Sequence, residues 1–119
     1  MKKNILFFSF FILLSCNLEP KIEFEKKIID IGTIPYKTSK TFYVKFRNVG
    51  DKELEIQKIQ PSCMCLLKST SKKILSSNEI DSVKFNYFAT EKGSHEEKIV
   101  FLLNTKKRFE IIQINSKVK

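Results

Sequence analysis

The chain has 119 residues, enough for one domain, and its 42% hydrophobic and 12% aromatic content is ordinary for a globular protein. Only three glycines and three prolines exclude a collagen-like or low-complexity chain. A formal net charge of +9 would favour a nucleic-acid partner in a cytosolic protein, but the N-terminal segment predicts a different compartment.

Residues 1–16, MKKNILFFSFFILLSC, have the organisation of an export signal. A charged start at residues 2–3 precedes an apolar core at 5–14, which is too short for a bilayer span of about 20 residues. The segment closes with the letters LLSC, which resemble the bacterial lipobox, in which the cysteine is diacylated before cleavage. A plain signal peptide or an anchor helix is the alternative interpretation.

We therefore expect residues 1–15 to be a lipoprotein signal peptide, Cys16 to carry the lipid, and 16–21 to form a short tether before a domain at 22–119. Removal of the signal lowers the net charge to +7, because two lysines are lost. A lipid anchor predicts a location in the cell envelope, outside the cytoplasm, and no nucleic-acid partner. Asn17 weakly favours the outer membrane of a Gram-negative bacterium, since aspartate at this position retains lipoproteins in the inner membrane.

Alternation of apolar and polar side chains with a period of two dominates the mature chain and indicates β-strands. The strands predicted from this alternation and from apolar runs are 22–25, 28–31, 42–47, 54–57, 63–68, 83–87, 99–103 and 109–114. The apolar run at 99–103 is expected for a central strand covered on both faces. Gly50, in the turn that follows the 42–47 strand, is free to take a positive φ.

Seven to eight short strands at intervals near 8–12 residues predict an all-β fold, an immunoglobulin-like antiparallel β-sandwich. No stretch shows a sustained apolar stripe at helical spacing.

Five motifs in a fixed order resemble a bacterial family known as domain of unknown function 1573. They are D-I-G-T-I at 30–34, F-x-V-x-F-x-N-x-G at 42–50, L-x-I at 54–56 followed by P-S-C-M-C at 61–65, Gly93 and Asn104. The resemblance spans about residues 22–117 and implies an immunoglobulin-like sandwich in a lipoprotein or secreted protein. It also implies similarity to the abnormal spindle, hydin and major sperm protein domains, which bind other proteins, but it implies no reaction.

The chain departs from that family at two positions. Met64 stands where the family has a glycine, which places any conformation with positive φ at this site in question. Ser77-Asn78-Glu79 replaces a P-G-E turn, and asparagine tolerates the left-handed conformation that glycine adopts.

Cys63 and Cys65 form the most distinctive candidate site. On a straight strand their Cα atoms would lie roughly 6.6 Å apart, beyond the usual 5.5–6 Å of a disulfide, so a bridge requires a bend after Pro61. A structural disulfide in the oxidising envelope is the first interpretation, since lipid accounts for Cys16. Free, partly buried thiols are the second. Redox chemistry or a soft metal such as Cu(I), for which Met64 offers a thioether, is the third.

The other candidate residues offer little chemistry. His95 lies in a polar segment beside Glu96 and Glu97, and Ser62 has no histidine or acid at a meaningful spacing. The two glutamates are adjacent, so on a strand they point to opposite faces. A closed four-ligand zinc site cannot be composed from the residues of one chain. We therefore expect the protein not to be an enzyme and to need no cofactor.

Together these patterns predict a membrane-anchored envelope lipoprotein that acts as a non-enzymatic protein-binding or assembly module. Its expected partners are the membrane, through the lipid, and another envelope protein. The alternative function is thiol-dependent redox or copper handling through Cys63 and Cys65. Basic residues at 72–73 and 106–108 are interpreted as solvated loop tips, with docking of an anionic group as the alternative.

Overall fold

A computed structural model describes residues 18–119, and the predicted signal peptide and Cys16 lie outside this part of the chain. The described strands are β1 (Ile22–Phe24), β2 (Ile28–Ile34), β3 (Ser39–Asn48), β4 (Leu54–Pro61), β5 (Leu66–Lys68), β6 (Ile74–Leu75), β7 (Ile80–Phe88), β8 (Gly93–Leu103) and β9 (Phe109–Val118). Over residues 18–119, no helix is long and apolar enough to span a bilayer.

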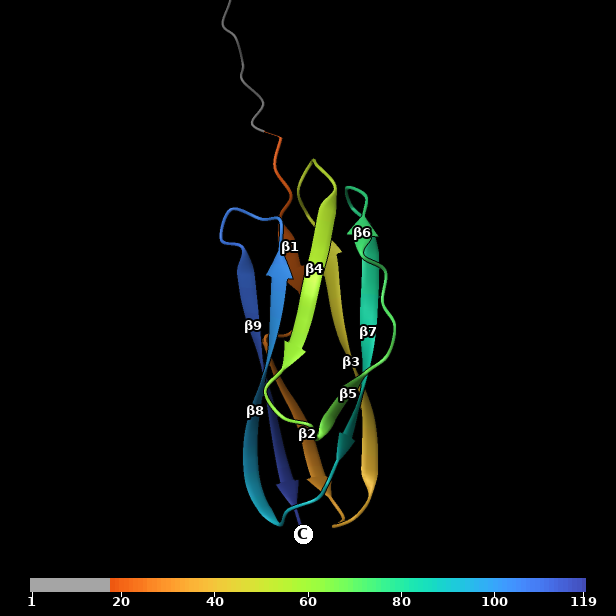
Figure 1. Cartoon of the computed structure of the whole chain (residues 1–119), viewed down its shortest axis with the longest axis vertical. Coiled ribbons are helices and arrows are strands. Elements are labelled where there is room, and N and C mark those ends of the chain that lie inside the picture. Colours follow the sequence, from red (N-terminus) through yellow and green to blue (C-terminus); the bar gives the residue numbers. More distant parts are fainter. Residues whose placement is uncertain (1–17) are drawn as a thin grey trace, which may run out of the picture.

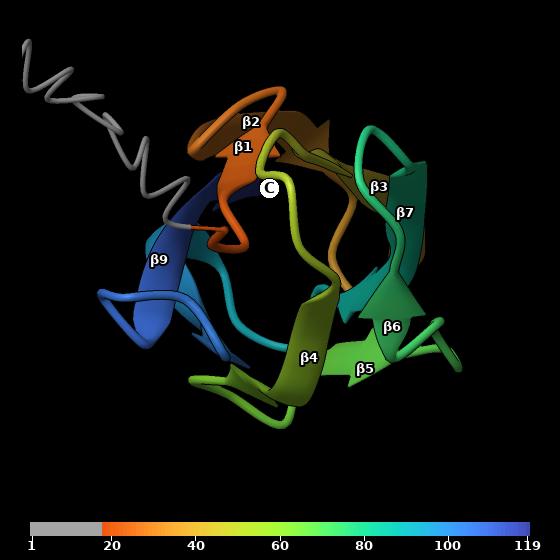
Figure 2. The ribbon, with the colours of Figure 1, turned by 90° about the horizontal axis from the view of Figure 1, so that it is seen from above.

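The strands form the two layers of a β-sandwich (Figure 1). Sheet A has the order β1-β3-β7-β5, and sheet B has the order β2-β9-β8-β4-β6. Figure 2 looks along the long axis and shows the strands of both sheets arranged around a common interior. The predicted all-β immunoglobulin-like sandwich is confirmed. The described chain has one strand more than the seven to eight expected, because the two-residue β6 pairs with the start of β4.

The N-terminal strands β1 and β2 divide between the two sheets. β1 pairs antiparallel with β3, and β2 then continues beside β9 on the edge of sheet B. The pair β2–β9 is parallel, with Ile28 opposite Gln113 and Ile34 opposite Val118. The prediction that both strands lie at sheet edges is confirmed, whereas the expectation of a purely antiparallel sandwich is wrong at this one pair. A strand that crosses from one sheet to the other without a hairpin need not reverse its direction.

The core is filled by alternate side chains of the long strands, as the period of two requires. Phe24 and Phe46 from sheet A pack against Phe101 from sheet B, with ring centroids 5.1–5.9 Å apart in edge-on arrangements. Edge-to-face aromatic pairs add stabilisation beyond their buried area. This aromatic cluster joins the two sheets near the end at which β1 begins.

Strand β8 is central in sheet B, between β9 and β4, as its apolar run predicts. The prediction that other residues cover both faces of this strand is wrong, however. Ile99, Phe101 and Leu103 are buried in the core, whereas Val100 and Leu102 point outward and stay partly exposed. Within the described chain, no further layer packs on the outside of this sheet.

Gly50 is required for close packing, and it does not use the positive φ that a glycine is free to take in this turn. A Cβ at this position would collide with the backbone of residues 19–21, which crosses directly over the turn. The buried Asn48 holds the same turn, because its amide group donates to the Lys52 and Leu75 carbonyls and accepts from the Gly50 N–H. Asn78 adopts φ 68° in the turn before β7, as asparagine in place of glycine predicts.

Candidate functional site

Cys63 and Cys65 lie in a turn between β4 and β5, where the chain crosses from sheet B to sheet A (Figure 1). The strand predicted over 63–68 begins only at Leu66, because the chain bends as soon as β4 ends at Pro61. The bend brings the two Cα atoms to 5.1 Å, and the structure joins the cysteines by a disulfide. We call residues 62–65 the cysteine turn.

Backbone hydrogen bonds attach each end of the cysteine turn to a different sheet. On the sheet B side, the N–H of Ser62 donates to the carbonyl of Lys98 at 2.8 Å. On the sheet A side, the N–H of Phe88 donates to the carbonyl of Cys65 at 2.8 Å. Both cysteines are half-buried and pack against the core. The disulfide therefore closes the short crossover between the two layers of the sandwich.

Met64, between the two cysteines, is turned away from them. Its side chain is 96% exposed, and it is not among the residues with positive φ. The bend therefore forms without a glycine at this position. Because the thioether faces solvent, it does not contribute a third sulfur ligand beside the two cysteines, as the copper hypothesis requires.

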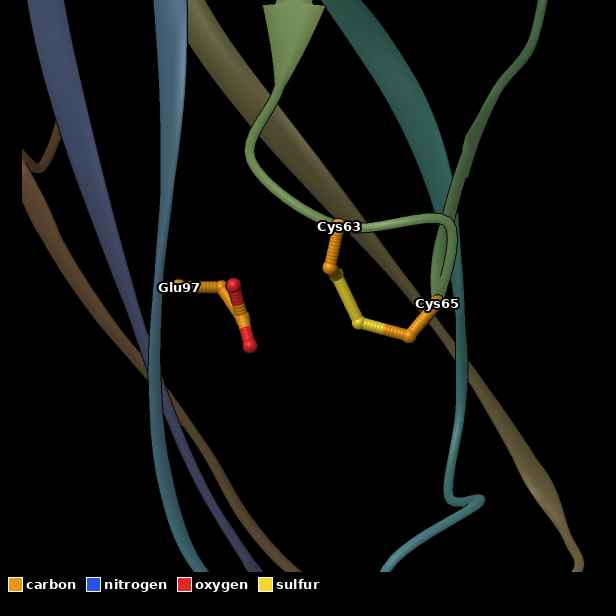
Figure 3. Close-up of side chains that lie close together, drawn as sticks. All are labelled: Cys63, Cys65 and Glu97. Atoms are coloured by element: carbon orange, nitrogen blue, oxygen red, sulfur yellow. A yellow bond between two sulfur atoms is a disulfide. The ribbon is translucent and has the colours of Figure 1, made fainter.

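Glu97 on β8 completes this cluster and was missed by the sequence analysis. Ser62 donates from Oγ to Glu97 Oε2 at 2.7 Å and accepts from the Lys98 N–H at 2.8 Å. One carboxylate oxygen of Glu97 and the sulfurs of Cys63 and Cys65 all lie within 4.8 Å of one another (Figure 3). Ser62 thus has an acid as hydrogen-bond partner in the fold, 35 residues away, although no acid lies at a meaningful spacing in the sequence.

Strand alternation carried the signal for Glu97. Counting back by two from the buried Ile99 places Glu97 on the inner side of β8 and Glu96 on the outer side. The structure has this arrangement, with Glu97 half-buried and Glu96 exposed. His95 stays outside the cluster, because its Nε2 hydrogen-bonds the Glu91 carbonyl at 2.7 Å.

One of the two basic loop tips forms a well-defined ion pair. Lys72 contacts Glu79 at 2.6 Å, and the Ser76 N–H also donates to this carboxylate. The hydrogen bond from Lys72, followed by that from Ser76, lowers the pKa of Glu79, and the same bond to Glu79 raises the pKa of Lys72. In the second tip, Lys107 approaches Glu110 at 3.4 Å.

A second candidate site is the exposed outer side of β8 and β9. Val100 pairs with Ile111 and Leu102 pairs with Phe109 across the two strands. The exposed fractions are 38% for Leu102 and 43% for both Phe109 and Ile111. We call these four residues the apolar face. Polar side chains adjoin it, Lys58 and Gln60 on β4 and Gln113 further along β9.

Three solved structures with related folds show where this architecture occurs. A protein of unknown function from Porphyromonas gingivalis W83 has a TM-score of 0.73 and 12% identity, covering 82% of this chain and 46% of that one. PapD-like domain 7 of human CEP192 has a TM-score of 0.70 and 13% identity, covering 85% and 87%. The YadV chaperone has a TM-score of 0.63 and 11% identity, covering 82% and 52%. At these identities the similarity shows the fold alone.

The chain thus spans about half the length of the Porphyromonas protein and of the chaperone. No curated protein sequence matches it significantly. A family model does match, over residues 20–117, which is nearly the whole described domain. The chain belongs to the family of HYDIN/CFA65/VesB-like immunoglobulin-like domains.

Proposed function

We propose that this protein is a non-enzymatic protein-interaction module, that the apolar face is its docking surface, and that a lipid on Cys16 holds it in the cell envelope. Support for an interaction role comes from the fold, which it shares with a PapD-like domain and with a protein named as a chaperone. Membership of the domain of unknown function 1573 family is part of the same proposal and rests on the five motifs.

The exposed apolar face is the observation that carries this proposal. Its two cross-strand pairs place four apolar side chains side by side, with the polar Lys58, Gln60 and Gln113 beside them and the exposed Ile28 next to Gln113 on β2. A contiguous apolar patch with a polar rim is typical of a protein interface, where burial of Phe109 and of the aliphatic side chains would stabilise a complex. A protein with a complementary apolar strand or sheet surface is the partner that these residues favour.

The described N-terminus supports an anchor at one end of the sandwich. The chain enters beside the loop between β8 and β9 (Figure 1). Residues 19–23 and Lys106–Lys107 line an open pocket of about 410 Å³ at this place. The C-terminus lies at the opposite end. A basic loop beside the tether is suited to an anionic membrane surface, because each lysine near such a surface contributes about 1 kcal/mol of favourable electrostatic binding free energy. We propose the outer membrane as its location.

The anchor is tested by Cys16→Ala. We expect this variant to lose labelling by a palmitate analogue and to leave the membrane fraction. Persistence of both properties would exclude lipidation at Cys16.

The docking surface is tested by a photo-crosslinking amino acid at Ile111 in the full chain, expressed in its native cells. Tyr43, exposed on the outer side of sheet A, is the matched control position. We expect a discrete protein adduct from position 111 and none from position 43, and Leu102→Lys should abolish it. Equal adduct patterns from the two positions, or no adduct from 111, would contradict the proposal.

A further inference from the structure

We propose that the cysteine turn, once reduced, is a binding site for a borderline-soft divalent cation of the zinc class. The ligands are Cys63 Sγ, Cys65 Sγ and a carboxylate oxygen of Glu97. This inference depends neither on the lipid anchor nor on the apolar face, and it differs from the copper hypothesis in its ligands and in its metal.

The spacing of the three ligand atoms fits such an ion. In a tetrahedral zinc site with Zn–S near 2.3 Å and Zn–O near 2.0–2.2 Å, ligand atoms lie roughly 3.5–3.8 Å apart. In the structure the two sulfurs are bonded to each other, and one Glu97 oxygen lies within 4.8 Å of both. Reduction frees the sulfurs to move apart to the spacing of two ligands. Small side-chain rotations therefore bring them onto one ion, and Figure 3 shows the Glu97 side chain extending from β8 toward the disulfide.

The surroundings hold the carboxylate in place. Ser62 Oγ donates to Glu97 Oε2, and the Lys98 N–H donates to Ser62 Oγ. This chain of hydrogen bonds fixes both the hydroxyl and the carboxylate before any ion arrives. Such outer contacts orient metal ligands in many sites, and their loss typically costs about 10–100-fold in metal affinity.

The ligand set selects the class of metal. Two thiolates with one carboxylate suit Zn²⁺, which accepts sulfur and oxygen together. Cu(I) favours thiolate and thioether ligands, but Met64 is directed into solvent and the third member of the cluster offers a hard oxygen. Three protein ligands leave the fourth position to water, so the site is expected to exchange its ion. A closed structural zinc site, in contrast, has four protein ligands and no water.

Reduction gates the site, because a disulfide sulfur is a poor metal ligand. A dithiol reductant transfers two electrons and two protons to the Cys63–Cys65 bond, which gives two thiols while the reductant forms its own disulfide. Binding of the cation then displaces the two thiol protons into solvent, and Glu97 contributes a carboxylate oxygen. The oxidised protein is expected not to bind.

The experiment uses the purified protein, reduced with a dithiol, desalted without oxygen and titrated with Zn²⁺ against a chromophoric chelator. We expect one equivalent of Zn²⁺ per reduced chain and none per oxidised chain. Ser62→Ala should weaken affinity about 10–100-fold, as the loss of a contact that orients a ligand does. Glu97→Gln, which replaces the charged ligand itself, should weaken affinity at least as much. Glu96→Gln is the matched control, since its side chain lies on the other side of β8, and should change affinity less than twofold.

A spectroscopic measurement shows which residues bind the ion even if a variant lowers the amount of folded protein. Co²⁺ bound to the reduced protein should show sulfur-to-cobalt charge transfer for two thiolates, and Glu97→Gln should shift its ligand-field bands while Glu96→Gln leaves them unchanged. The proposal is overturned if reduced protein takes up no Zn²⁺. It is equally overturned if Glu97→Gln binds as wild type does, because the thiols would then act without the carboxylate.

Discussion

The outer faces of the two sheets differ although their inner faces are built alike. On sheet A, the outward positions along the middle of β3 and β7 are polar or charged apart from the ring of Tyr43, namely Thr41, Lys45, Arg47, Ser82, Lys84 and Asn86. Its exposed apolar side chains are separated from one another, with Ile80 and Phe88 at the two ends of β7 and Leu67 on the edge strand β5. On sheet B, the corresponding centre is the apolar face of β8 and β9. Both sheets bury every second side chain in the shared core. The inner faces thus determine the fold. The outer faces differ in role, because that of sheet A is a solvated surface whereas that of sheet B is a candidate docking surface.

The largest expected effect separates the two sides of β8. Phe101→Ala should lower the free energy of unfolding by about 3–5 kcal/mol, because Phe101 fills the core between the sheets. Leu102→Ala, at the next position, should change it by less than about 0.5 kcal/mol, because this side chain remains partly exposed. Urea unfolding of both variants checks the difference. A comparable loss in Leu102→Ala would mean that another layer covers this face.

A smaller effect concerns the crossover that joins the two sheets. The double variant Cys63→Ser, Cys65→Ser removes the disulfide that closes a loop of three residues. The chain entropy of such a loop predicts that the free energy of unfolding falls by roughly 1.5 kcal/mol. Thermal unfolding of the double variant and of oxidised wild type, without reductant, measures it. Identical midpoints would show that the hydrogen bonds of Ser62 and Cys65 hold the two layers without the bridge.

The sequence predicts the strands well, because alternation reports directly on which side chains face the core. It fails on the outer side of 99–103, where both alternate sets are apolar and periodicity cannot distinguish a buried layer from a docking surface. It also fails on contacts between distant segments. Glu97 lies 35 residues after Ser62, and only the pairing of β4 with β8 brings them together. The two-residue β6 is likewise too short to show a period.

The smallest effect concerns Glu110, which lies between Phe109 and Ile111 in β9 but is largely shielded from solvent. Burial alone would raise its pKa, but hydrogen bonds and charge from Lys27, with the charge of Lys107, outweigh burial and lower the pKa below 4.5. The pairing therefore stabilises the fold above pH 4.5, and this contribution disappears as pH falls through the lowered pKa.

We expect Glu110→Gln to cost less than about 1 kcal/mol at neutral pH, since Lys27 is more than half exposed. The difference from wild type should shrink below pH 4.5. Urea midpoints from pH 7 to pH 3 measure it, with Glu96→Gln as a control that takes part in none of the described ion pairs. A difference that grows toward low pH would reverse the assigned sign.

The central claim is that the apolar face is covered in the envelope while the outer side of sheet A is not. Hydroxyl-radical footprinting compares oxidation of Phe109 and Leu102 with oxidation of Tyr43, in the purified protein and in native envelopes. All three side chains are partly exposed in the isolated domain. We predict that oxidation of Phe109 and Leu102 falls at least severalfold in envelopes while that of Tyr43 is unchanged. Equal rates in both preparations, or protection of Tyr43 alone, would contradict the account.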